Sequence, residues 1–344
     1  LTAALNIAVY LLIDPILSFQ NVPDEVYGLM REYLWIVFFG IGATFLYNFF
    51  ACLLRAMGNS LAPLIFLALS ALLNITLDLV FVLALSWGVG GAAAATVIAQ
   101  FVSGVGVAVY TFVRCKKLRP TRRDFRFSGG ILREISSLSI LTCLQQSIMN
   151  FGILLVQGLV NSFGPAVMAA FAAAVKIDSF AYMPVQDFGN AFSTFVAQNY
   201  GAGKEQRIRG GIKRSVQLTF GFCAVVSVVV VAFAKPLMMI FVQPQKNQIL
   251  DIGVGYLRIV GVFYFGIGCL FLLYGLFRAV KKPGVSVVLT IVSLGTRVAL
   301  AYLLAPFVGV VGIWSSIPIG WVLADFVGLL YYRWYRKNAI RLGQ

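Results

Sequence analysis

Three polar residues in two consecutive apolar stretches are suited to binding a cation. Asn74 and Asp78 lie four residues apart, so a helix places them on one face, and Thr96 lies in the next apolar stretch. At about 1.5 Å per residue, Asp78 and Thr96 lie about 12 Å and about 10 Å from the same membrane surface. Their carboxylate, amide and hydroxyl oxygens are hard ligands suited to Na⁺, and the carboxylate could instead carry a proton. The alternative is a structural contact between helices.

A second group of polar residues could line a substrate cavity. Lys176, Phe180, Met183 and Asp187 recur at helical spacing on one face, and Asp178 lies on another. Aromatic and Met side chains suit irregular apolar molecules, and acids favour cations. The alternative is an ion pair between Lys176 and an acid that holds helices together. The candidate cavity residues are Gln146, Asn150, Lys176, Asp178, Met183, Asp187 and Arg297.

The elements that carry these residues are predicted to cross a membrane. Of the 344 residues, 60% are hydrophobic and 11% are charged, whereas a soluble protein has about 25% charged residues. A bilayer span needs about 20 apolar residues, and the chain offers ten such runs. They are 1–19, 33–54, 61–86, 89–113, 136–161, 165–198, 214–241, 254–277, 284–306 and 308–332. We expect Arg297 to neutralise an acid inside the bundle, with Asp325 and Asp187 as candidates.

The 27 Lys and Arg residues indicate orientation rather than nucleic-acid binding, although the net charge is +15. Most lie in alternate loops, so the positive-inside rule places the loops 114–133 and 199–214 and the C-terminus in the cytoplasm. The chain has no His, which excludes His-based metal sites and general bases, and its five Cys have no paired spacing. We therefore expect no enzyme, no nucleic-acid partner and no cofactor other than a coupling Na⁺ or H⁺.

An internal repeat organises the spans into two lobes. The segment LLRAMGNSLAP at 53–63 matches LFRAVKKPGVS at 276–286, and other matches keep nearly the same offset between the copies. The later copy has six spans and the earlier copy four, so two further spans are expected before the first residue. An even number of spans per copy predicts a parallel repeat. We predict an all-α polytopic bundle with an N-lobe (1–113), a linker (114–133), a C-lobe (134–332) and a basic tail (333–344).

Two segments carry a resemblance to a known family. The segment AQNYGAGKEQRIRGGIKRS at 197–215 and the segment LLRAMGNS at 53–60 resemble the multidrug and toxic compound extrusion (MATE) family. The resemblance covers spans three to twelve of a twelve-span transporter. It implies an antiporter that exports drugs, organic cations or metabolites in exchange for Na⁺ or H⁺ by alternating access. The alternative within the same superfold is a lipid-linked saccharide flippase.

The resemblance also implies site residues, location and partners. In the family, an Asn and an Asp four apart and a Thr on the next span form a cation site, and these map to Asn74, Asp78 and Thr96. The family's partner Asp on span one has no counterpart in this chain, and we expect the family's second cation site, in the C-lobe, to be absent because its acids are missing. We expect a monomer in a bacterial inner membrane that contacts lipid and small amphiphilic or cationic substrates.

Overall fold

The computed structural model describes residues 2–19, 24–115 and 128–342. All secondary-structure elements in these ranges are helices, as the sequence predicts. The chain divides into two compact units, unit 1 (Leu1–Phe127) and unit 2 (Ser128–Gln344). Of the predicted linker 114–133, residues 116–127 lie outside the described part of the chain.

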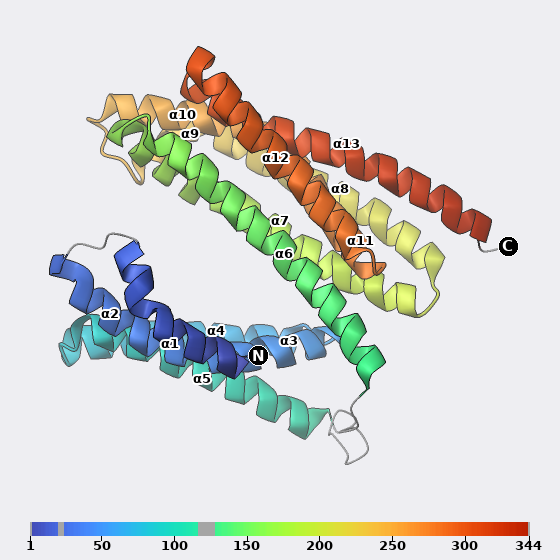
Figure 1. Ribbon diagram of the computed structural model, residues 1–344, viewed down its shortest axis with the longest axis horizontal. Coiled ribbons are helices and arrows are strands. Elements are labelled where there is room, and N and C mark those ends of the chain that lie inside the picture. Colours follow the sequence, from blue (N-terminus) through green and yellow to red (C-terminus); the bar gives the residue numbers. More distant parts are fainter. Residues whose placement is uncertain (1, 20–23, 116–127, 343–344) are drawn as a thin grey trace. The chain divides into compact units, whose positions relative to one another are not determined.

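Unit 1, drawn in blue to teal in Figure 1, is arranged around one central helix. Its elements are α1 (Thr2–Phe19), α2 (Asp24–Phe39), α3 (Ile41–Ala56), α4 (Leu61–Asp78), the π-helix η1 (Leu79–Ala84) and α5 (Gly88–Arg114). Helix α5 packs against α2, α3 and α4, and its buried face includes Ala95, Ala99 and Gly104. A Cβ at Gly104 would lie 2.6 Å from the carbonyl oxygen of Ala43, so α3 and α5 approach backbone to backbone.

Unit 2 is arranged around α11, which is buried along most of its length. Its helices are α6 (Gly129–Asn161), α7 (Pro165–Gly201), α8 (Glu205–Ala232), α9 (Ala234–Met239), α10 (Asn247–Gly261), α11 (Tyr264–Ala279), α12 (Pro283–Val308) and α13 (Val310–Leu342). A Cβ at Gly275 would lie 2.6 Å from the carbonyl oxygen of Gly189, so α7 and α11 also meet backbone to backbone.

The helix boundaries repeat between the units. Helices α2 and α3 begin at Asp24 and Ile41, and α10 and α11 begin at Asn247 and Tyr264, so both pairs of starts keep the same offset. After the next turn the offset is shorter by a single position: α4 and α12 begin at Leu61 and Pro283, and α5 and α13 at Gly88 and Val310. Each copy also has a helix that is interrupted at a corresponding place, after Phe39 and after Gly261. The duplicated sequence therefore forms duplicated helices.

The length and hydropathy of the helices agree with a multi-pass membrane protein. Eight helices of the described chain are long and apolar enough to span a bilayer, and α10 with α11, bent by 52°, makes a ninth. The remaining predicted span, 1–19, falls on α1, which has 18 residues. Two boundaries differ from prediction. Helix α6 begins at Gly129, inside the predicted linker, and α13 continues to Leu342 through most of the predicted tail.

Three helices end in the same hydrogen-bonded turn. After α3, the N–H groups of Gly58 and Asn59 donate to Arg55 and Leu54, and the same pattern follows α7 and α11. The residue at the left-handed position is Gly58 (φ 87°) in the first, Gly203 (φ 65°) in the second and Lys281 (φ 59°) in the third. Only the third turn places a side chain where glycine is favoured.

Candidate functional site

The predicted cation site of unit 1 has one hydrogen bond and one unpartnered oxygen. The Nδ2 of Asn74 donates to Oγ1 of Thr96 at 3.4 Å, so the structure brings α4 and α5 together at these two residues. Oδ1 of Asp78 is buried and has no hydrogen-bond partner in the described part of the chain. A buried carboxylate oxygen without a donor is costly, and a cation or a proton would satisfy it.

The backbone changes from α-helix to π-helix directly after Asp78. Helix α4 ends at Asp78 and η1 runs from Leu79 to Ala84, closed by a hydrogen bond from the N–H of Leu85 to the carbonyl of Val80 at 2.9 Å. Single π-turns inside α-helices are rare and are frequent at functional sites. In unit 2 the corresponding helix α12 has no such turn and runs without interruption to Val308.

Unit 2 contains a different polar cluster. Asp178 on α7 accepts a hydrogen bond of 2.6 Å from the hydroxyl of Tyr256 and another from the hydroxyl of Tyr264. Arg297 on α12 is within electrostatic range of Asp178, Tyr182 and Tyr256. Its Nε is buried without a partner, and it forms no hydrogen bond or ion pair with any described residue.

The prediction that Asp325 or Asp187 neutralises Arg297 is wrong. The acid that interacts with Arg297 is Asp178. The reason is the orientation of α7: its rotation points Asp178 into unit 2, whereas Asp187, later on the same helix, is exposed. Asp325 on α13 faces α11, where a Cβ at Gly266 would lie 3.8 Å from its Oδ2, and its Oδ1 is buried with no hydrogen-bond partner among the described residues.

The other predicted cavity residues lie on the surface of unit 2. On α7, Lys176, Met183 and Asp187 are exposed, and so is Phe180 between them (76% exposed), as their shared helical face predicts. Gln146 and Asn150 are exposed on α6. The ammonium of Lys176 lies 5.8 Å from the ring centre of Phe241, and no described acid forms an ion pair with it. The predicted set is therefore divided into an exposed face and an inward-facing Asp178–Arg297 pair.

Sequence reasoning missed Tyr256 and Tyr264. Both are buried in the bent pair α10 and α11, and both hydroxyls bind Asp178. A tyrosine in an apolar span needs a partner for its hydroxyl, and this was the available signal. Tyr256 also packs edge-on against Trp314 at 5.0 Å, and Trp314 stacks on Phe171 at 5.3 Å, so aromatic rings hold the cluster in place.

The described residues form no group of three or more His, Cys, Asp or Glu side chains that could hold a metal ion, and all five cysteines are free. The donors in unit 1 are one carboxylate with neutral oxygens, which suits a weakly bound monovalent cation better than a tightly held divalent one.

Comparison with known proteins places the chain in a family. The family model described as MatE matches residues 1–80 and 141–303. The chain is 28% identical to the "Probable multidrug resistance protein YpnP" of Bacillus subtilis, over 99% of this chain and 76% of that protein. It is 23% identical to the "Probable multidrug resistance protein NorM" of Thermotoga maritima (94% and 71% covered) and 21% identical to the "FAD transporter" of Shewanella oneidensis (93% and 71% covered).

Solved structures agree on the fold. A MATE crystal structure in the bent conformation has a TM-score of 0.91 and 24% identity, covering 99% of this chain and 76% of that one. A MOP superfamily transporter from Pyrococcus furiosus, whose report describes a binding pocket of reverse polarity, has a TM-score of 0.92 at 24% identity and the same coverage. The family match extends over more than half of the chain, and the matched regions include Asn74, Asp78 and Arg297. This chain belongs to the MatE family of multi-pass membrane transporters.

Proposed function

We propose that this protein is a secondary antiporter that exports drugs, organic cations or metabolites in exchange for Na⁺ or H⁺. The observation that carries the proposal is the buried, unpartnered Oδ1 of Asp78 beside the Asn74–Thr96 hydrogen bond. A charge at the centre of a bilayer costs about 2.5–3.5 kcal/mol on insertion scales, so such an acid is retained for a function. Cation binding or protonation at Asp78 removes that cost in one state of the transport cycle.

The substrate side of the proposal rests on the exposed face of unit 2. Phe180 and Met183 provide apolar, deformable contacts, and Asp187 on the same face attracts cations. Gln146 and Asn150 add hydrogen-bonding groups from α6. Relatives named for multidrug resistance support an exporter and do not favour the flippase alternative. The name of the Shewanella relative extends the candidate substrates to nucleotide-like metabolites.

The inward-facing pair has a different role in this proposal. Asp178 stabilises unit 2, since the two tyrosine hydroxyls satisfy its carboxylate, and Arg297 lies within electrostatic range of it. In transport they keep the exposed face of α7 in a fixed orientation against α10 and α11. A direct contact with substrate is therefore assigned to the exposed residues and not to this pair.

The cellular setting follows from charge. We place the protein in a bacterial inner membrane as a monomer. The loops 114–133 and 199–214 and the C-terminus are placed in the cytoplasm, because basic residues concentrate there. The energy source is an ion gradient and no organic cofactor takes part, in keeping with a transporter and not an enzyme.

The test is ethidium efflux from cells that express the protein, driven by a Na⁺ pulse or by a pH pulse. Asp78→Asn removes the negative charge and keeps the size of the side chain, and we expect at least tenfold slower efflux with either driving ion. The matched control is Asp251→Asn, at an exposed acid of α10. The pulse that drives efflux identifies the coupling ion. Unchanged efflux by Asp78→Asn would overturn the proposed role.

A further inference from the structure

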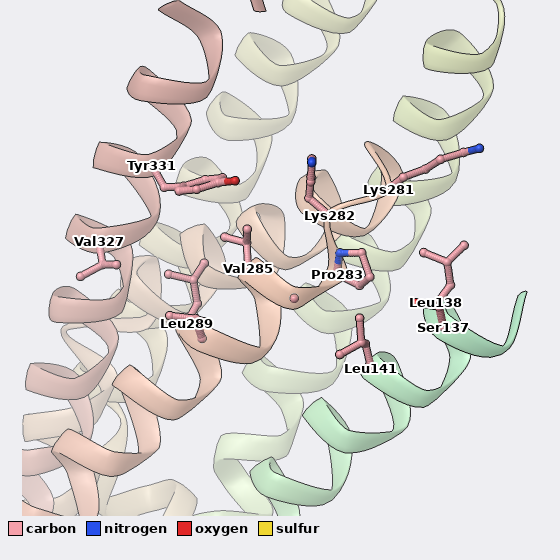
Figure 2. Close-up of a pocket in the computed structure, with 12 residues that line it drawn as sticks. Ser137, Leu138, Leu141, Lys281, Lys282, Pro283, Val285, Leu289, Val327 and Tyr331 are labelled. Carbon is pink, nitrogen blue, oxygen red and sulfur yellow. The ribbon is translucent and has the colours of Figure 1, made fainter. Parts of the chain in front are cut away.

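A cavity of about 480 Å³ lies within unit 2, between the first part of α6, the first part of α12 and the last part of α13 (Figure 2). Its floor is apolar, and Leu138, Leu141, Val285, Leu289 and Val327 contribute to it. Lys282 and Tyr331 also line the cavity, and in Figure 2 the ammonium and the hydroxyl both lie above Val285 and Leu289. The cavity is therefore amphipathic, with a cation and a hydroxyl at one end and apolar side chains along the rest. We call the end formed by Lys282 and Tyr331 the mouth.

The charge at the mouth is not balanced by any residue that the structure describes. No acid is among the described residues that line the cavity. The acid nearby, Glu134, is paired with Lys281 at 2.5 Å; Lys281 also lines the cavity, and in Figure 2 its side chain extends away from Tyr331. Lys282 is exposed and forms no hydrogen bond or ion pair with a described residue. An anionic group that enters the mouth would meet an available ammonium.

Aromatic residues mark the depth of the mouth in the membrane. The end of α13 carries Tyr331, Tyr332, Arg333 and Trp334 in succession, and the rings of Tyr331 and Trp334 lie 5.5 Å apart. Trp and Tyr gather at the level of lipid headgroups, and basic residues lie just beyond them. The mouth is thus at headgroup level, and the apolar floor extends from there toward the hydrocarbon core.

The repeat shows that the fold does not require this cavity. Phe66 and Val288 take the same place, the sixth, in the equivalent helices α4 and α12, and Val288 lines the cavity and is 52% exposed. The ring of Phe66 lies directly on Gly106, where an added Cβ would meet it at 2.7 Å, and packs edge-on against Tyr110 at 5.9 Å. In unit 1 the sixth residue is therefore a half-buried aromatic ring. In unit 2 it is an exposed valine at the cavity wall, and Leu273 and Leu289 contact Gly328, the counterpart of Gly106.

The turn before α12 also differs from its counterpart in unit 1. In unit 1, Asn59 follows the left-handed Gly58 and its Oδ1 accepts a hydrogen bond from the N–H of Ala62 at 3.1 Å, which caps α4. In unit 2, Lys281 and Lys282 occupy these two places, and Lys281 takes a positive φ that glycine adopts without strain. Unit 2 therefore has two lysines at the places where unit 1 has an unstrained glycine and a capping asparagine.

We propose that this cavity is a binding site for one anionic phospholipid, with the phosphate at Lys282 and Tyr331 and an acyl chain along the apolar floor. A phosphate accepts hydrogen bonds from an ammonium and a hydroxyl, and the apolar floor is a surface on which an acyl chain can pack. The site is independent of the transported substrate and of the coupling ion.

The test is native mass spectrometry of the full chain, released from detergent and titrated with phosphatidylglycerol, phosphatidylcholine of the same chains, or inorganic phosphate. We expect one tightly bound phosphatidylglycerol and about fivefold weaker phosphatidylcholine, since one lysine near an anionic group contributes about that factor. Lys282→Ala should reduce phosphatidylglycerol binding to the phosphatidylcholine level. Val288→Phe, which introduces the unit 1 residue, should weaken both lipids by filling the cavity.

Two matched controls separate the site from general effects. Lys246→Ala removes an exposed lysine from the loop before α10, and Ile291→Phe enlarges an exposed residue of α12 that does not line the cavity. Both should bind lipid as the parent does. Equal binding of the two lipids by the parent, or equal binding by the parent, Lys282→Ala and Val288→Phe, would overturn the proposal. Saturable binding of inorganic phosphate that displaces the lipid would show a free-anion site instead and would also overturn it. Melting temperatures confirm that each variant is folded.

Discussion

Units 1 and 2 share a frame of helices, but Asp78 in unit 1 and Asp178 in unit 2 have opposite surroundings. In unit 1, Asp78 stands beside neutral groups with one oxygen unpartnered among the described residues, at the start of a π-helical turn. In unit 2, Asp178 accepts two tyrosine hydroxyls and is near the guanidinium of Arg297. In the first arrangement one carboxylate oxygen is left for a ligand. In the second both carboxylate oxygens accept a hydroxyl, while Nε of Arg297 has no partner among the described residues. Duplication preserved helix boundaries and turns, while the polar chemistry diverged.

The strongest test of this comparison removes each acid in turn and measures stability. Asp178→Ala leaves two buried tyrosine hydroxyls without an acceptor and Arg297 without a nearby negative charge. We expect unit 2 to lose about 3–5 kcal/mol of unfolding free energy, because each of the two buried hydroxyls left without an acceptor costs about 1–3 kcal/mol. Asp78→Ala removes a carboxylate with an unsatisfied oxygen and should change stability by less than about 1 kcal/mol.

Denaturant unfolding in detergent micelles, followed by tryptophan fluorescence, measures both variants. Asp178→Ala combined with Arg297→Met should recover part of the loss, because the guanidinium charge, which no longer has an acid nearby, is then removed as well. Equal losses for Asp78→Ala and Asp178→Ala would mean that both acids are structural, and the contrast between the units would fail.

The next test concerns helix packing. Each unit has a close backbone contact at a glycine, but at positions that the repeat does not relate: Gly104 against Ala43 in unit 1, and Gly275 against Gly189 in unit 2. Gly104→Ala and Gly275→Ala place a Cβ 2.6 Å from a carbonyl oxygen, so each should cost about 1–3 kcal/mol through helix displacement. Gly158→Ala on α6, which meets nothing within 4 Å, is the control and should leave the melting temperature of the protein unchanged. Loss of stability in the control alone would contradict this account.

The fold was more predictable than the site, for physical reasons. Length and apolar composition are sufficient to predict spans, and the nearly constant offset between the two copies predicted the repeated helix starts. Contacts between helices depend on their rotation and depth, which one sequence does not specify. The matched depths of Asp78 and Thr96 predicted that the two helices meet there, and Thr96 does contact Asn74, one turn before Asp78. Arg297, in contrast, was assigned the wrong acid. The π-helix after Asp78 has no distinctive composition, so nothing in the sequence indicated it.

A smaller effect is expected from exchanging residues between the repeats. Phe66→Val in unit 1 removes a half-buried ring from Tyr110 and Gly106 and should cost about 1 kcal/mol. Val288→Phe in unit 2 fills an existing cavity and should not destabilise the protein. Thermal melts in detergent compare the two, and the double exchange should be additive because the sites lie in separate units. A large loss for Val288→Phe would mean that the cavity walls cannot accept the ring.

The smallest effect is expected at the turn where the two copies differ in backbone strain. Lys281→Gly gives unit 2 the glycine that unit 1 has at this position, which relieves the positive φ and removes the exposed ion pair with Glu134. These changes oppose each other, and exposed pairs contribute little, so the melting temperature should hardly change near neutral pH.

Hydrogen bonding to Glu134 raises the pKa of Lys281 above its ordinary value of about 10.5. The contribution of the pair is therefore complete below that pH and is lost as the pH rises through the raised pKa. Melting curves from neutral to alkaline pH should show the variant gaining relative to the parent only at the alkaline end. A variant that is less stable than the parent at every pH would show that the side chain holds this turn by contacts other than the ion pair.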